Sequence, residues 1–192
     1  MKGLTMSIPY PEQEHTGSPL TPSRIEARAL KAATSGLAVI PLEGKMPTTG
    51  ATPRGVKDAS RDPERVRAMF KRAGERATGY GIATGTASGI VVVDVDGPKA
   101  RAEAERRGLQ AEYAVRTGRA EGDGWHLYYA SPPGVEVKSR TIAPGLELKG
   151  DGSYVVGQGS RHPSGAVYEL VKDGDPSPAP DWVTRPEPEH GE

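Results

Sequence analysis

The sequence contains no cysteine, a single phenylalanine and two tryptophans among its 192 residues. The absence of cysteine excludes a disulfide framework, a thiol nucleophile and a cysteine-ligated zinc site. Purely aliphatic runs reach only four residues, as in residues 90–93, whereas a membrane-spanning helix needs about 20 apolar residues. Prolines and glutamates occupy the N-terminal stretch that a secretory signal would need to be apolar. We therefore expect a cytoplasmic protein that makes no membrane contact.

The net charge is zero, with 25 basic and 25 acidic side chains, but the two signs are unevenly distributed. Residues 24–76 carry twelve Lys and Arg against six Asp and Glu, and residues 169–192 carry seven acids against two bases. This distribution is compatible with a face that binds a polyanion and a solubilising tail. Charge alone favours the simpler alternative of solvated helix faces and a frayed end.

The length predicts one domain, and the 25 glycines and 18 prolines indicate that it is rich in loops. We expect a disordered extension over residues 1–21, a folded domain over residues 22–183 and a disordered tail over residues 184–192. Periodicity predicts helices over residues 23–35, 63–73 and 98–107, the first beginning with a capping box at Ser23 to Glu26. A long loop is expected over residues 43–59.

Short strands dominate the rest of the domain. They are predicted over residues 37–42, 81–84, 90–96, 113–117, 125–130, 146–148 and 154–156. One helix between two strands, followed mainly by short strands, predicts an α+β fold with a largely antiparallel sheet.

The most distinctive segment is residues 90–97, where four aliphatic residues lead into Asp94, Val95, Asp96 and Gly97. Side chains two apart on a strand share a face, so Asp94 and Asp96 are expected to point together while Val93 and Val95 point into the core. Carboxylates about 6–7 Å apart repel each other unless a cation lies between them, and Mg²⁺ suits such a pair. The alternative is a strand that simply ends in solvent at a turn.

Two further strands offer polar residues in apolar surroundings. Alternation is expected to place His126 and Tyr128 on one face of their strand, and Glu147 and Lys149 on the outward face of theirs. A lone histidine among aromatics is more often a packed residue than a functional one. If the strands are neighbours and share one face, however, these residues and the two aspartates form an acidic metal site beside an imidazole. The Gly- and Ser-rich residues 149–165 are suited to cradling phosphates, or to forming ordinary hairpin turns.

Taken together and in this order, these segments resemble the prim-pol domain of bifunctional DNA primase/polymerases, in the archaeo-eukaryotic primase superfamily. The similarity runs from about residue 23 to residue 183. The matching segments are GLAVIPLEGKMP (36–47), GVKDAS (55–60), GYGIATGTASGIVVVDVDG (79–97), VRTGRAEGDGWHLYY (115–129), GLELKGDGSYVVGQGSRHPSGAVYEL (145–170) and PDWV (180–183).

The resemblance implies a prim-pol catalytic domain over residues 22–183. Its fold would be an RRM-like, mostly antiparallel sheet with an additional N-terminal α/β module, as in the archaeo-eukaryotic primase catalytic core. Its activity would be template-directed, two-metal transfer of a nucleotide from a dNTP or NTP to a 3′-hydroxyl during DNA replication. The implied partners are a single-stranded DNA template or primer–template and a replicative helicase, encoded separately or in a full-length protein. The setting would be the nucleoid, or plasmid or phage replication.

The resemblance also implies roles for individual residues. Asp94, Asp96 and Glu147 would bind two Mg²⁺ or Mn²⁺ ions, and His126 would contact the incoming nucleotide. The remaining positions expected to bind the nucleotide, chiefly its triphosphate, are Lys149, Ser160, His162, Arg116 and Lys45.

Departures from the family pattern keep other functions open. Glu147 stands where the family usually has Asp, and its extra methylene shifts the carboxylate. Gly122 to Gly124 replaces Gly-Gly, and Val56 replaces an aromatic residue. The alternative is therefore a catalytically weak or inactive relative that binds nucleotide or nucleic acid. The helical bundle and helicase module of many relatives do not follow residue 183, so we expect the catalytic domain alone.

A less favoured alternative is a phosphohydrolase of the haloacid dehalogenase type, in which the first aspartate of the D-x-D motif is a nucleophile. In such enzymes the motif lies near the chain start. Here Pro98 follows the glycine and more than eighty residues precede the motif. An RRM-like binding module would need exposed aromatics on its sheet, and only Tyr128 is expected on the polar face.

Overall fold

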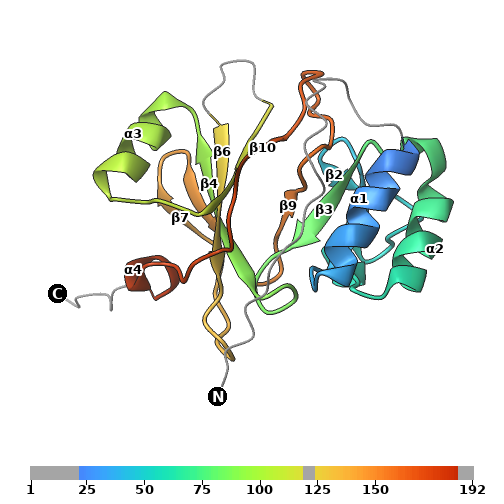
Figure 1. The fold of residues 1–192 in the computed structure, drawn as a ribbon, viewed down its shortest axis with the longest axis horizontal. Helices are drawn as coiled ribbons and strands as arrows, with labels where there is room; N and C mark the ends of the chain where they lie inside the picture. Colours follow the sequence, from blue (N-terminus) through green and yellow to red (C-terminus); the bar gives the residue numbers. More distant parts are fainter. Residues whose placement is uncertain (1–21, 119–123, 186–192) are drawn as a thin grey trace.

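The computed structural model describes residues 22–118 and 124–185. Within these ranges the strands form two sheets, in which each strand is antiparallel to its partners (Figure 1). The strand order is β2-β1-β3-β9 in the four-stranded sheet and β10-β5-β6-β4-β8-β7 in the six-stranded sheet. The expected α+β class with antiparallel pairing is confirmed. The expected extension over residues 1–21 and most of the tail lie outside the described residues.

Helices flank both sheets (Figure 1). The strands are β1 (Val39–Glu43), β2 (Met46–Pro47), β3 (Gly79–Ala83), β4 (Ile90–Asp96), β5 (Tyr113–Arg116), β6 (Gly124–Ala130), β7 (Arg140–Ala143), β8 (Leu146–Lys149), β9 (Tyr154–Val156) and β10 (Glu169–Asp173). The α-helices are α1 (Pro22–Thr34), α2 (Pro63–Ala73), α3 (Pro98–Arg106) and α4 (Asp181–Thr184), and the short 3₁₀ helices are η1 (Gly55–Asp58) and η2 (Gly74–Arg76). No helix in the described ranges has the length and apolar content needed to cross a bilayer.

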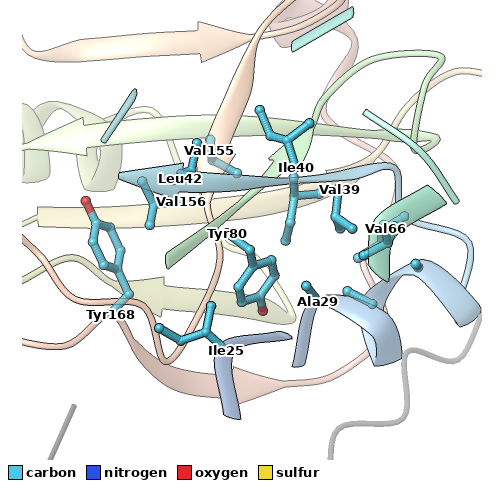
Figure 2. Packing of buried hydrophobic residues seen from close by; sticks show 14 of the residues in the cluster. Ile25, Ala29, Val39, Ile40, Leu42, Val66, Tyr80, Val155, Val156 and Tyr168 are labelled. Carbon is cyan, nitrogen blue, oxygen red and sulfur yellow. The ribbon is translucent and has the colours of Figure 1, made fainter. Parts of the chain in front are cut away.

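The helices α1 and α2 cover the four-stranded sheet. In α2, Asp62 caps the helix by accepting a hydrogen bond from the backbone N–H of Glu64, and Pro63 supplies the fixed φ of a first helical residue. Val66 lies on the buried face of this helix. Figure 2 shows it together with Ala29 of α1 and Val39 of β1, within one hydrophobic cluster. This apolar packing fixes β1 and its neighbours against the two helices.

The first four residues of the central strand β4, residues 90–93, are apolar on both faces. Val91, Val93 and Val95 pack into a cluster with residues of α3 and α4. Ile90 and Val92, on the other face, belong to the cluster that also contains the four-stranded sheet and α1. The even-numbered face of β4 is therefore directed toward the first sheet, and this face also carries the two aspartates.

Four details differ from expectation. The helix α1 begins at Pro22, so the predicted capping box is wrong, because Ser23 already lies within the first turn. The additional module is not purely N-terminal, because β9 forms an edge of its sheet beside β3. At the C-terminal end, Thr184 is buried in α4, one residue beyond the expected end of the domain. Strands β7 and β10, which the sequence did not predict, form the two edges of the six-stranded sheet.

Candidate active site

Three acidic side chains share one face of the six-stranded sheet. Asp94 of β4 lies directly opposite His126 of β6 on one side and Glu147 of β8 on the other. Directly paired residues in an antiparallel sheet point to the same face, and Asp96, two residues along β4, points with them. Strand pairing therefore shows that these residues share one face, which alternation within a single strand could not determine.

The face of the six-stranded sheet that carries Asp94, Asp96 and Glu147, here called the acidic face, begins where the core between the two sheets ends. Ile90 and Val92 precede Asp94 on the same face and are fully buried, whereas the side chain of Asp94 is 19% exposed and Asp96 is half-buried. The apolar part of β4 thus anchors the strand, and its last residues present carboxylates at the margin of the core. Such a position lets the carboxylates reach a ligand while the strand keeps their spacing fixed.

His126 is buried beside these acids, between aromatic rings. Its Nε2 atom lies 3.6 Å from Oδ1 of Asp94, and its ring centroid is 5.7 Å from that of Tyr168. The pKa of His126 is lowered to about 3, chiefly by burial; the attraction of Asp96 opposes this shift, and the charges of Lys149 and Lys45 add to it. The imidazole is therefore neutral at neutral pH. It can donate one hydrogen bond to a ligand, but it carries no positive charge at that pH.

Lys149 lies on the same face as the three acids, opposite Val92 of β4. Its Nζ atom is 2.5 Å from Oε2 of Glu147 and 3.9 Å from Oδ2 of Asp94. Burial lowers the pKa of Lys149, but the hydrogen bond to Glu147 and the attraction of Asp94, Glu147 and Asp96 outweigh it and raise the pKa. The side chain is thus an ammonium ion that bridges two of the acids.

Lys45 reaches the same region from the turn between β1 and β2. Its charge acts on His126. Its backbone carbonyl accepts a hydrogen bond of 2.8 Å from the hydroxyl of Tyr154 on β9, a residue that also senses the charge of Lys149. Two lysines, Lys149 on β8 and Lys45 in the turn between β1 and β2, therefore lie near the acidic face.

His162 is linked to the site through an aromatic residue. Its ring centroid lies 5.7 Å from that of Tyr168, whose ring is also in contact with His126. The backbone N–H of Ser164 donates a hydrogen bond of 3.1 Å to Nδ1 of His162, which orients the imidazole. The two histidines are thus brought together around one tyrosine.

Two residues expected to contact the nucleotide make other contacts within the fold. Ser160 is fully buried, and its hydroxyl accepts a hydrogen bond of 3.1 Å from the backbone N–H of Tyr80, so we assign it a structural role. Arg116 pairs with Trp125 across β5 and β6, whereas its neighbour Val115 pairs with His126. The side chain of Arg116 therefore leaves β5 on the face of the sheet opposite the acids. Its Nη2 atom lies 2.7 Å from Oε2 of Glu169.

The acidic face provides the hard oxygen ligands that Mg²⁺ and Mn²⁺ prefer. In the described part of the chain, however, no three His, Asp or Glu side chains are already arranged around one point as a complete metal site. The carboxylate of Glu147 is turned toward Lys149 and is about half-exposed. The donor chemistry therefore fits a divalent ion that takes one or two carboxylates from the protein and its remaining ligands from phosphate oxygens and water.

Sequence reasoning missed three residues that shape this site. Tyr168 separates the two histidines, and Tyr154 joins β9 to the turn that carries Lys45. The carboxylate of Asp151 accepts hydrogen bonds from the backbone N–H groups of Thr86 and Val137, which fixes the loop that follows Lys149. The Lys-Gly-Asp-Gly segment could have suggested a turn anchored by its aspartate. No comparable pattern in the sequence around Tyr168 indicated that it would lie between the two histidines.

Comparison with known proteins supports the resemblance. No curated protein matches the chain. The model of the family described as "Bifunctional DNA primase/polymerase, N-terminal" matches residues 29–182, from α1 to the middle of α4. The match includes every strand of both sheets and all the site residues discussed above. The chain therefore belongs to the Prim-Pol family of bifunctional DNA primases and polymerases.

Proposed function

We propose that this chain catalyses template-directed transfer of a nucleotide from a dNTP or NTP to a 3′-hydroxyl on DNA. The observation that carries the proposal is the pairing of Asp94 with both His126 and Glu147, which gathers three carboxylates and an imidazole on one face. Family membership supports the same reaction class. It gives no support to a phosphohydrolase in which the first aspartate would be a nucleophile.

In this reaction the 3′-oxygen bonds to the α-phosphorus of the nucleotide, and the bond to pyrophosphate breaks. Asp94, Asp96 and Glu147 would hold Mg²⁺ or Mn²⁺. When bound, such ions neutralise charge on the phosphates and activate the attacking oxygen. His126, being neutral, would orient the nucleotide through a hydrogen bond. Lys149 supplies positive charge for the triphosphate.

The proposed site extends toward its substrates through Lys45, His162 and the basic region of residues 24–76. Lys45 is exposed and makes no ion pair within the described residues. It is thus available to a phosphate of the nucleotide or template. We propose a single-stranded template or primer–template as the DNA partner. Contacts of this kind lose affinity as salt rises.

One observation favours a second function. The carboxylate of Glu147 is engaged by Lys149, and its longer side chain departs from the aspartate usual in the family. A relative that binds nucleotide without turnover would tolerate this arrangement. The same experiment distinguishes the two functions.

The test is extension of a labelled primer on a template with dNTPs and Mg²⁺ or Mn²⁺. Asp94→Asn combined with Asp96→Asn should abolish extension. The melting temperature should change little, because the relief of repulsion between the carboxylates offsets the lost attraction to Lys149. The matched control combines Glu136→Gln with Asp175→Asn, two exposed acids elsewhere on the surface, and should extend at the wild-type rate. Wild-type extension by the Asp94 and Asp96 variant would refute the metal assignment. Failure of the wild-type chain with both metals would support nucleotide binding without turnover.

A further inference from the structure

Lys149 occupies the space between two carboxylates of the acidic face. Its Nζ atom contacts Oε2 of Glu147 at 2.5 Å and lies 3.9 Å from Oδ2 of Asp94. The lysine side chain is 23% exposed and the Asp94 side chain 19% exposed, so these two members of the cluster are only partly solvated, whereas Glu147 is about half-exposed. The ammonium therefore already neutralises part of the charge that a divalent ion would neutralise.

An ammonium and a divalent cation repel each other strongly at this separation, because the surroundings are only partly solvated. Both also require the same carboxylate oxygens as partners. Lys149 must therefore leave the gap between Asp94 and Glu147 before those two carboxylates can share a divalent ion. The side chain that leaves is an ammonium separated from its two carboxylate partners, so it needs another anion as a partner.

Only the side chain of Lys149 is free to move. Its backbone is paired with Val92 in the centre of the sheet. The following residue, Gly150, is closely packed, since a Cβ atom there would lie 2.0 Å from the carbonyl oxygen of Val137. The backbone N–H of Gly150 also donates a hydrogen bond of 2.8 Å to the hydroxyl of Ser139. A lysine on a fixed strand still has a flexible side chain of four carbons, and rotation about its bonds can move the ammonium by several ångströms.

We propose that Lys149 is a displaceable counter-ion that couples nucleotide binding to divalent-ion binding. Without nucleotide, its ammonium holds Asp94 and Glu147 together and lowers the affinity of the face for a divalent ion. An incoming triphosphate draws the ammonium away, and the vacated carboxylates then bind the ion more tightly. By linkage, the ion raises the affinity for nucleotide by the same factor. This inference rests on the proposed function, because it takes the ligand to be a nucleoside triphosphate.

The test measures binding rather than turnover. Lys149→Met should tighten binding of Mn²⁺ alone, followed by electron paramagnetic resonance, by a factor within the range of about 5 to 150 that is typical of coupled sites. The same variant should weaken binding of dATP measured by calorimetry in EDTA. Lys149→Arg, which keeps the charge, should change both much less. Lys138→Met, an exposed lysine in the segment before β7, is the matched control and should change neither.

Opposite signs for the two ligands are the signature of a displaceable counter-ion. If Lys149→Met binds both Mn²⁺ and dATP more weakly and melts at a lower temperature, Lys149 is only a structural ion pair and the proposal fails. Unchanged Mn²⁺ affinity also overturns it. Lys149→Gln repeats the comparison should the methionine variant not fold. Primer extension by the wild-type chain is scored separately, so loss of the proposed function and loss of the coupling are recorded by different assays.

Discussion

Acid should destabilise the fold through His126. Burial lowers its pKa to about 3, a change that Lys149 and Lys45 assist and Asp96 opposes. An unfolded histidine has a pKa of about 6.5. Between these two values the unfolded chain binds a proton at this position that the folded chain does not. The stability that depends on neutral His126 is therefore complete above pH 6.5 and is lost progressively as the pH falls toward 3.

The size of the effect follows from the pKa difference. At pH 4.5 the unfolded histidine is two pH units below its pKa and is almost fully protonated, whereas the folded imidazole is still neutral. Between the two pKa values, each unit by which the pH falls lowers the free energy of unfolding by about 1.4 kcal/mol. The free energy of unfolding should therefore fall by about 3 kcal/mol from His126 alone between pH 7.5 and pH 4.5. That is a substantial part of the roughly 5–15 kcal/mol typical of a whole domain.

Urea unfolding of the wild type and of His126→Gln, each at pH 7.5 and pH 4.5 in EDTA, isolates this contribution. Glutamine keeps hydrogen-bonding capacity but does not titrate. The lowered pKa values of carboxyl groups such as Asp58 and Asp151 affect both proteins equally. The wild type should lose about 3 kcal/mol more than the variant over this range. The comparison uses the change with pH, so a constant destabilisation by the substitution cancels.

Equal pH dependence in the two proteins would refute the reasoning. It would mean that His126 takes up a proton inside the fold near its ordinary pKa. The nearest partner that could stabilise an imidazolium is Asp94, whose Oδ1 atom lies 3.6 Å from Nε2. In that case the attraction of the carboxylates would outweigh the loss of solvation, and His126 could offer positive charge to a triphosphate after all.

Two further predictions concern residues that we consider structural. Ser160→Ala should lower the free energy of unfolding by about 1–3 kcal/mol, because the buried N–H of Tyr80 loses its acceptor. The affinity for dATP should stay unchanged; weaker dATP binding with intact stability would instead indicate that Ser160 contacts the triphosphate. Asp151→Asn should destabilise the fold by about 1–3 kcal/mol in urea, because an amide donor would face the N–H groups of Thr86 or Val137. Hydrogen bonds from Thr86 and Val137 outweigh burial and lower the pKa of Asp151, so its contribution is complete at neutral pH and is lost only as the pH falls from about 4 through this lowered pKa. The difference between the variant and the wild type should therefore begin to shrink below about pH 4; a constant difference would contradict this.

The sequence predicted the elements whose apolar pattern is strong. The bounds of β4 were obtained correctly because four aliphatic residues lead into strict alternation. The helix α2 was also predicted correctly, because Asp62 and Pro63 mark its beginning, Gly74 its end, and Val66 and Phe70 its buried face. In each case the local chain carries both the period and the terminating residues, so no distant contact is needed to define the element.

Strands β7 and β10 were missed because their side chains are mostly exposed or half-buried. Each lies at an edge of the six-stranded sheet and is held by backbone pairing with one neighbour, β8 or β5. Backbone pairing leaves no mark in the side-chain pattern. The position of β9 in the other sheet was equally hidden, because its partner β3 precedes it by about seventy residues. Long-range pairing of this kind depends on the whole fold.

The candidate site shows the same division between what one strand determines and what pairing determines. Alternation within β5 separates Val115 from Arg116, and alternation within β6 separates Trp125 from His126. Neither strand alone specifies whether Arg116 shares a face with His126 or with Trp125, because a shift of one residue in register would exchange the two outcomes. The observed register pairs Arg116 with Trp125, which removes it from the acidic face. In the same way, the register of β4 against β6 and β8 places Asp94 beside His126 and Glu147. Any substitution that shifts β4 against β6 or β8 should therefore separate the site residues even when every acidic residue is retained.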